Sequence, residues 1–255
     1  MCLLVIAVNQ YPELPLIVAG NRDEFHARPT QDAHWWPDQP DLLGGRDLQA
    51  GGTWLAINRR GRFAAVTNYR DAQREQQPLL SRGHLITGFL GGGDEPLQHV
   101  DAIDGERYAG FNLVVAERES AAYLSNRGAP TRRLETGLYG LSNATLDDPW
   151  TKVTRSKAKL AQLIEQDNVN ETTLLRLLDD RDKASTDEVE ANGLSFSMAH
   201  ALTAPFVLNP KYGTRCSTVL TISRGGHARF TERRVDPAGI PSGDSTFAFD
   251  LVGVD

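Results

Sequence analysis

The chain opens with Met1-Cys2-Leu3-Leu4-Val5-Ile6-Ala7-Val8, and Leu14-Pro15-Leu16-Ile17-Val18-Ala19 follows after the break Tyr11-Pro12-Glu13. Both apolar segments are short, rich in Val, Leu and Ile, and bounded by turn residues. Those three features favour β-strands over helices. The opening of the chain therefore predicts a β-hairpin that begins at Cys2.

A polar cluster, Asn21-Arg22-Asp23-Glu24, lies at the end of the second predicted strand. If that end of the strand is buried, these polar side chains need hydrogen-bond partners or a functional role, because unpaired buried polar groups are costly. An Arg beside Cys2 would favour the thiolate, and an Asp could hold an amine by a hydrogen bond. The alternative is an Asx-type turn with a surface ion pair. Since Arg22 directly precedes Asp23, their side chains point to opposite faces of a regular strand.

Further strands are predicted along the chain, with helices grouped in the middle. Residues 26–50 hold many prolines, glycines and charges and are expected to form a long loop. Strands open and close the chain and no βαβ alternation occurs, so we expect an α+β fold of mainly antiparallel sheets in one domain, residues 1–255. The predicted strands are 53–58, 63–68, 111–117, 121–126, 137–142, 214–222, 228–232 and 246–251, and the predicted helices are 79–90, 96–103, a helix from 148 and 170–178.

The clearest helix signal is Asp148-Pro149, because Asp is a favoured N-cap and Pro a favoured first helical residue. Trp150, Val153, Leu160 and Ile164 then recur close to helical spacing and predict one apolar face.

Composition narrows the function classes. The net charge of -6 argues against a nucleic-acid-binding face, which needs clustered Lys and Arg. No segment approaches the length of apolar chain, roughly 20 residues, that a membrane helix needs, so no stable membrane insertion is expected. The first residues lack a basic region, and Asn9 and Gln10 interrupt the apolar run too early for a signal peptide. With only two cysteines, Cys2 and Cys216, we expect a reduced, cytoplasmic protein.

Cys2 is the first candidate for chemistry. If Met1 is removed, one residue carries a thiol and a free α-amine. The amine has an ordinary pKa of about 7.7–8.0, so it can act as a base at neutral pH. The thiol is intrinsically nucleophilic. The alternative is that Cys2 is a small apolar residue at the start of a strand.

Three further polar residues lie at or near predicted strand ends: Asn68, Asn143 and Arg215. An Asn side chain can donate to the oxyanion of acyl transfer, and an Arg can pair with a carboxylate or a thiolate. Each residue taken alone is more typical of a turn than of a catalytic site. The histidines show no metal-ligand spacing, so no metal site is expected.

The motifs together resemble the NRDE family, the family of transport and Golgi organisation protein 2. They occur in order over nearly the whole chain, and they are Met1-Cys2, Asn21-Arg22-Asp23-Glu24-Phe25 with Arg28-Pro29, Gly51-Gly52-Thr53-Trp54-Leu55, Thr67-Asn68-Tyr69, Gly110-Phe111-Asn112-Leu113, Gly140-Leu141-Ser142-Asn143, Asp148-Pro149-Trp150 and Tyr212-Gly213-Thr214-Arg215.

The resemblance implies a four-layer αββα fold of the N-terminal-nucleophile hydrolase type, distantly similar to choloylglycine hydrolase and penicillin V acylase. By that resemblance Cys2 is the nucleophile, Asp23 orients the α-amine, and Asn68 and Asn143 stabilise the oxyanion. Arg215 matches a late arginine near the thiol. The acylases carry an early Arg three residues before the Asp, where this sequence has Gly20 and places Arg22 instead.

Two functions follow from the resemblance. The first is an amidohydrolase or acyltransferase that acts on a small N-acylated molecule and needs no metal or organic cofactor. The second is a binding or trafficking protein for haem or an acyl compound, since members of the family are linked to haem trafficking and lipid metabolism. The state of the N-terminus separates the two, because a retained Met1 blocks the amine. Substrate and oligomeric state are left open by the sequence.

Overall fold

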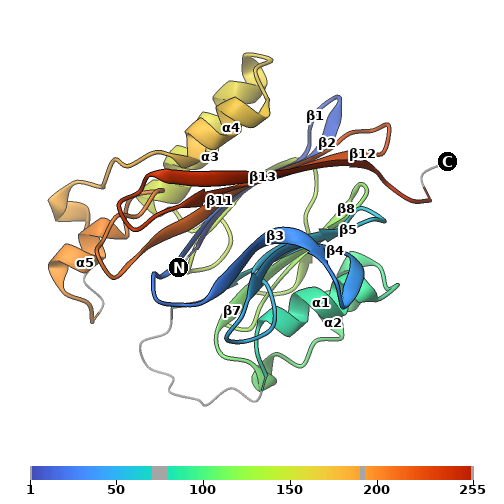
Figure 1. Cartoon of the computed structure of the whole chain (residues 1–255), viewed down its shortest axis with the longest axis horizontal. Coiled ribbons are helices and arrows are strands. Elements are labelled where there is room, and N and C mark those ends of the chain that lie inside the picture. The colour runs from blue at the N-terminus through green and yellow to red at the C-terminus, as the bar shows by residue number, and fades with distance from the viewer. Residues whose placement is uncertain (1, 71–79, 190–192, 254–255) are drawn as a thin grey trace.

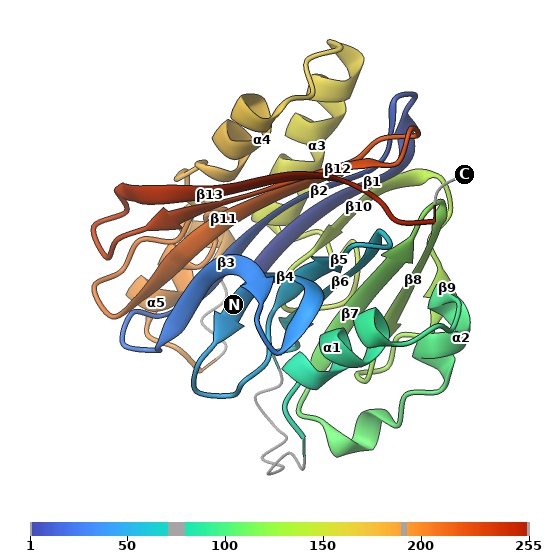
Figure 2. The ribbon, with the colours of Figure 1, turned by 45° about the vertical axis from the view of Figure 1, so that its right-hand side comes forward.

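Two β-sheets stacked face to face form the centre of the molecule, and helices cover their outer faces (Figure 1, Figure 2). The computed structural model describes residues 2–70, 80–189 and 193–253. Helices α3 (Thr151–Glu165) and α4 (Glu171–Leu178) pack on one sheet, and α1 (Gly83–Gly91) and α2 (Pro96–Asp101) pack on the other. This four-layer αββα arrangement confirms the predicted fold class.

The first sheet contains six strands in the order β10-β1-β2-β11-β12-β13, and every neighbouring pair is antiparallel. The predicted hairpin is its β1–β2 pair. Its strands are β1 (Cys2–Tyr11), β2 (Leu14–Phe25), β10 (Gly137–Leu141), β11 (Tyr212–Ile222), β12 (His227–Val235) and β13 (Pro241–Asp250).

The second sheet contains seven strands that follow one another in chain order. Its strands are β3 (Thr30–Trp36), β4 (Gln39–Asp47), β5 (Leu55–Asn58), β6 (Arg62–Asn68), β7 (Phe111–Glu117), β8 (Ser120–Ser125) and β9 (Arg132–Arg133). The prediction of a loop over residues 26–50 was wrong, because β3 and β4 occupy most of that range. Gly44 allows β4 to pack closely on β5: a Cβ there would lie 2.7 Å from the Leu55 carbonyl oxygen.

Five α-helices and two 3₁₀ turns are found in the described residues. They are α1 (Gly83–Gly91), α2 (Pro96–Asp101), α3 (Thr151–Glu165), α4 (Glu171–Leu178), α5 (Phe196–Ala201), η1 (Gly105–Arg107) and η2 (Thr186–Glu188). Position 79, where the first helix was predicted to begin, lies outside the described residues. None of the described helices is long and apolar enough to cross a bilayer.

Helix α3 begins later than the Asp148-Pro149 signal predicted. Its first residue is Thr151 and its N-cap is Trp150, whose backbone N–H donates to the Asp148 carbonyl at 2.8 Å. Asp148 and Pro149 therefore belong to a tight turn before the helix. By contrast, Asn170 caps α4 as a capping box with Thr173, close to the predicted start.

Strand alternation decides which side chains of the first sheet face the second. Leu4, Ile6 and Val8 join Trp54 and Phe63 in the core between the sheets. Val5, Ala7, Ile17 and Ala19 instead pack against Leu160 of α3 and the α4 leucines. Cys2 shares the alternation of Leu4 and Ile6, so its thiol faces the space between the sheets.

Candidate functional site

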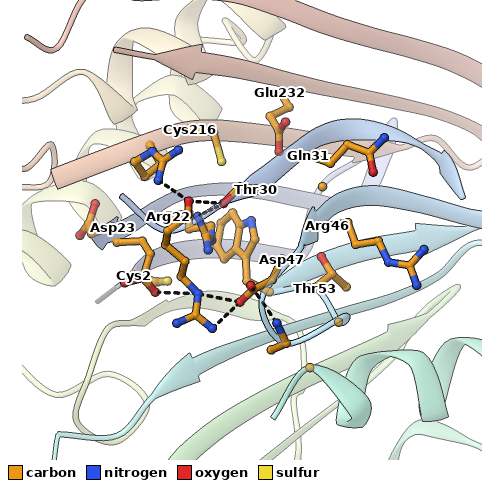
Figure 3. Close-up of a pocket in the computed structure, with 18 of the residues that line it drawn as sticks. Cys2, Arg22, Asp23, Thr30, Gln31, Arg46, Asp47, Thr53, Cys216 and Glu232 are labelled. Atoms are coloured by element: carbon orange, nitrogen blue, oxygen red, sulfur yellow. Dashed lines mark hydrogen bonds and ion pairs between the residues drawn. The ribbon is translucent and has the colours of Figure 1, made fainter. Parts of the chain in front are cut away.

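A cavity of about 350 Å³ lies between the two sheets, with Cys2 in its wall (Figure 3). Within the described residues, no group of three or more His, Cys, Asp or Glu is placed to hold a metal ion. The wall is strongly charged: its six arginines are Arg22, Arg28, Arg46, Arg82, Arg215 and Arg234, and its five acidic residues are Asp23, Glu24, Asp32, Asp47 and Glu232.

The Cys2 thiol is almost fully buried, with 8% of the residue exposed. Burial raises the pKa of this thiol and the Asp23 carboxylate adds to the rise, while the Arg22 charge and a hydrogen bond from the Asp23 backbone oppose it. The thiol is therefore protonated at neutral pH, and attack requires a base. Ser142 Oγ donates to the Cys2 carbonyl at 2.9 Å and ties this end of β1 to the segment after β10. Met1 lies outside the described residues.

Arg22 lies directly opposite Cys2 in the β1–β2 register, and it also lies opposite Cys216 on β11. Figure 3 shows Arg22 between the two cysteines. Its Nη1 donates to Thr30 Oγ1 at 3.2 Å, and only 6% of the residue is exposed. Opposite residues on paired strands share a face, so Arg22 lies on the thiol side of β2 and Asp23 on the other. The alternation predicted that the two side chains lie on opposite faces; it did not predict that Arg22 is the one on the thiol side.

The structure also explains why an arginine is absent at position 20. A Cβ on Gly20 would lie 2.6 Å from Leu4 Cδ2 and 3.1 Å from the Trp54 ring, so no long side chain fits there. Gly20 and Arg22 are two residues apart and share a face of β2. Arg22 therefore presents its guanidinium on the same face as position 20, but opposite Cys2 instead of opposite Leu4.

Asp23 borders the cavity but lies on the opposite face of β2 from Arg22, and it is 2% exposed. Its Oδ1 accepts a hydrogen bond from Thr214 Oγ1 at 2.8 Å, and its carbonyl accepts one from the Tyr212 hydroxyl at 2.7 Å. Burial raises the pKa of the Asp23 carboxyl, and the positive charge of Lys152 opposes that rise. These contacts place a carboxylate beside the N-terminal end of β1.

Lys152, in the first turn of α3, was not recognised in the sequence. It is 1% exposed, and its Nζ has no hydrogen-bond partner among the described residues. Burial lowers the pKa of its ammonium group, while the charges of Asp23 and Cys2 raise it. The apolar residues that predicted one buried face of α3 did not indicate that a neighbouring lysine would also be buried.

The two asparagines occupy different places. Asn68 lines the cavity at the end of β6 and is exposed. Asn143 is 1% exposed and is absent from the described cavity wall; its Nδ2 donates to the Asn68 carbonyl at 2.7 Å. The structure thus brings both to the site, with Asn68 in contact with the cavity and Asn143 holding the backbone of Asn68.

Arg215 lines the cavity from β11, where the register with β2 shifts between Thr214 and Cys216. Its Nη1 donates to the carbonyls of Phe25 (2.9 Å) and Arg28 (3.1 Å). Arg215 therefore holds the turn that follows β2, and burial lowers the pKa of its guanidinium.

A second buried pair in the cavity wall, Cys216 and Glu232, was also missed. Glu232 is 3% exposed, and its Oε1 accepts a hydrogen bond from the Ala33 backbone at 2.8 Å. Burial raises the pKa of Glu232, and the hydrogen bond from the Cys216 thiol opposes that rise. Burial likewise raises the pKa of Cys216 well above its ordinary value.

Glu232→Gln is expected to stabilise the protein at neutral pH. A carboxyl whose pKa is raised in the folded state loses stabilising free energy as pH rises from its unfolded pKa to its folded pKa. The amide keeps an oxygen for the Ala33 N–H but never ionises. Thermal unfolding should give a higher Tm for the variant at pH 7 and no difference below the ordinary glutamate value of 4.5. Equal Tm values at pH 7 would show that the buried carboxylate costs nothing.

The architecture matches solved structures at very low sequence identity. A mutant conjugated bile acid hydrolase from Clostridium perfringens superposes with a TM-score of 0.58 at 8% identity, covering 100% of this chain and 94% of that one. A second variant of that hydrolase gives a TM-score of 0.52 at 7% identity, covering 100% and 99%. These likenesses confirm the N-terminal-nucleophile hydrolase-like fold.

Sequence comparison establishes the family. The family model for Transport and Golgi organisation 2 matches residues 1–237. The human Transport and Golgi organization protein 2 homolog is 35% identical over 256 residues, which cover 91% of this chain and 92% of that protein. The Drosophila melanogaster Transport and Golgi organization protein 2 is 26% identical over 268 residues, covering 94% and 95%. The chain is therefore a member of the Transport and Golgi organisation 2 family.

Proposed function

We propose that this protein is a cysteine amidohydrolase or acyltransferase that acts on a small N-acylated, non-peptide amide. Cys2, freed by removal of Met1, is the nucleophile, and residues 1–255 act as one domain in the cytoplasm. The observation that carries the proposal is the position of the Cys2 thiol. It lies in the wall of a charged cavity, opposite Arg22 and next to Asp23, on a hydrolase-like fold.

The reaction begins with the α-amine of Cys2. Because burial keeps the thiol protonated, the neutral amine takes the thiol proton as sulfur attacks the amide carbonyl carbon. The carbonyl π electrons move to oxygen and form a tetrahedral oxyanion. Collapse breaks the C–N bond, and the α-ammonium returns its proton to the leaving amine. An acyl thioester on Cys2 remains.

Water or a second amine completes the cycle. The α-amine removes a proton from the incoming nucleophile, which attacks the thioester carbonyl. The second tetrahedral intermediate expels the Cys2 sulfur, which recovers its proton from the α-ammonium. With water the acyl group leaves as a carboxylic acid, and with an amine it leaves as a new amide.

The surrounding residues have separate roles in this proposal. Asn68, which lines the cavity, donates from its side chain to the oxyanion. Asn143 positions Asn68 through the hydrogen bond to its carbonyl. Asp23 accepts a hydrogen bond from the α-amine and orients it, and Arg22 offsets negative charge at sulfur. Arg215 supports the site through the turn after β2.

The second candidate is binding without turnover, of haem or an acyl compound. Its support is the naming of the relatives, which refers to transport and Golgi organisation and to no reaction. The charged wall of the cavity weighs against haem, since sites for large apolar ligands are lined mainly by apolar side chains.

Intact-mass measurement of the purified protein, before and after brief exposure to iodoacetamide near neutral pH, tests the proposal. We expect a mass without Met1 and fast addition of one label, which the Cys2→Ala variant loses. Cys216→Ala is the matched control, because Cys216 is equally buried in the same cavity wall, and it should label as the parent does. Retained Met1, or slow labelling that Cys2→Ala does not change, would refute the hydrolase and leave ligand binding as the function.

A further inference from the structure

The arginines of the cavity wall divide into two groups of three. Three are neutralised by carboxylates: Arg28 pairs with Asp47 at 2.7 Å, Arg46 with Asp38 at 2.7 Å, and Arg234 with Asp32 at 3.2 Å. The other three, Arg22, Arg82 and Arg215, form no ion pair with any described residue.

Each of the second group donates only to neutral oxygens in the described structure. Arg22 bonds to the Thr30 hydroxyl, Arg82 Nη1 to the Gly110 carbonyl at 3.0 Å, and Arg215 to two backbone carbonyls. A guanidinium has five N–H donors, so each retains donors that these contacts do not use. Arg22 is buried, and a charge held out of water without a counter-charge is costly, while Arg82 and Arg215 are half-buried.

The acidic residues of the wall act on these three arginines only from beyond ion-pair distance: Arg22 lowers the pKa values of Asp23 and Glu232, and Glu24 raises those of Arg82 and Arg215. Asp47 and Asp32 are engaged by Arg28 and Arg234. Glu24 lies 3.8 Å from Arg28 and accepts a hydrogen bond from the Phe25 backbone at 2.8 Å. The two remaining carboxyls, Asp23 and Glu232, have pKa values raised by burial.

Arg22, Arg82 and Arg215 also surround the reactive end of the cavity. Arg22 lies opposite Cys2. The pKa of Arg215 is lowered mainly by burial and further by the positive charge of Arg22. Burial lowers the pKa of the Arg82 guanidinium, and the nearby Cys2 thiol opposes that fall. Helix α1 begins at Gly83, directly after Arg82, with no acidic residue in its first turn, so its positive end adds to the field.

We infer that the cavity binds a ligand carrying an anionic oxygen group, a carboxylate, sulfonate or phosphate, that Arg22, Arg82 and Arg215 hold near Cys2. Planar guanidinium groups match the oxygens of such anions in a two-bond geometry. The inference deepens the proposed function, because it makes the substrate an acyl amide with a negative charge close to the amide. A ligand of this class supplies the direct ion pairs that the described residues of the wall do not make with these arginines.

Binding to the Cys2→Ala protein tests the inference without any turnover. The probes are N-octanoylglycine, its neutral amide N-octanoylglycinamide, and N-octanoyl-O-phosphoethanolamine, measured by calorimetry at low and high ionic strength. We expect at least one anion to bind about tenfold or more tighter than the neutral amide, because a hydrogen bond to a charged group contributes about 1.5–3 kcal/mol. The preference should shrink as salt increases. Comparing the affinities of the carboxylate and phosphate probes shows which of the two anions the cavity prefers.

Arg82→Gln and Arg215→Gln should each reduce that preference severalfold. Arg46→Gln is the matched control, because Arg46 lines the same cavity but is paired with Asp38, and it should leave the preference unchanged. Equal affinity for charged and neutral probes, no binding of any probe, or an equal loss in Arg46→Gln would overturn the inference. Anion binding by a protein whose native form cleaves no amide would support the inference and refute the proposed hydrolase.

Discussion

Replacing Cys2 with alanine is expected to reduce kcat/KM for an N-acyl amide by about a thousandfold or more, because no other group can form the thioester in the proposed reaction. Removal of a catalytic nucleophile typically has effects of at least this size. The measurement is amide cleavage followed by mass spectrometry, with a screen of acyl amides on the parent protein beforehand. Because the side chain is small, the Tm of the variant should stay close to that of the parent.

Cys216→Ala provides the control for that result. Cys216 lies in the same cavity wall and is 6% exposed, but its thiol is hydrogen-bonded to Glu232 and its own backbone nitrogen is a peptide amide that cannot act as the base. We expect its kcat/KM to remain within a few-fold of the parent value. If Cys2→Ala kept full activity, or if Cys216→Ala lost as much, Cys2 would not be the nucleophile.

Phe63→Ala is expected to lower the free energy of unfolding by about 3–5 kcal/mol, the usual cost of deleting a buried aromatic ring. Phe63 is 0% exposed and lies in the core between the sheets with Trp54 and Cys2. The loss of the ring leaves a void where the two sheets meet. Urea denaturation measures the change through the midpoint at constant m-value.

Phe196→Ala is the matched control for the lost ring. Phe196 is 52% exposed on α5, so its removal should change the free energy of unfolding by no more than about 0.5 kcal/mol. Similar losses in the two variants would mean that the core between the sheets does not dominate stability.

Local pattern predicted much of the fold. The Cys2 hairpin, the β5–β6 and β7–β8 pairs and the capped start of α4 all follow from apolar spacing and turn residues, which depend on neighbours in the chain. The predicted loop over residues 26–50 failed for a specific reason. There the glycines that suggested a loop are packing requirements, since Gly44 lies against the backbone of β5.

The site residues were also predicted only in part from the sequence. Strand alternation alone placed Arg22 and Asp23 on opposite faces, and the motifs marked Cys2, Asn68, Asn143 and Arg215. Which face of β2 meets the thiol depended on the register with β1, in which Arg22 is opposite Cys2. Because of that pairing, the guanidinium of Arg22 lies beside the Cys2 thiol, which the polar cluster in the sequence did not by itself establish.

The buried charges were decided by tertiary structure alone. Lys152 is buried because α3 packs on β1, and Glu232 is buried because its carboxylate meets the backbone of Ala33, 199 residues away. Secondary structure and face alternation are local properties, so the sequence carries them directly. Burial, pKa and the balance of charge in the cavity depend on which distant segments meet, and only the folded chain brings those segments together.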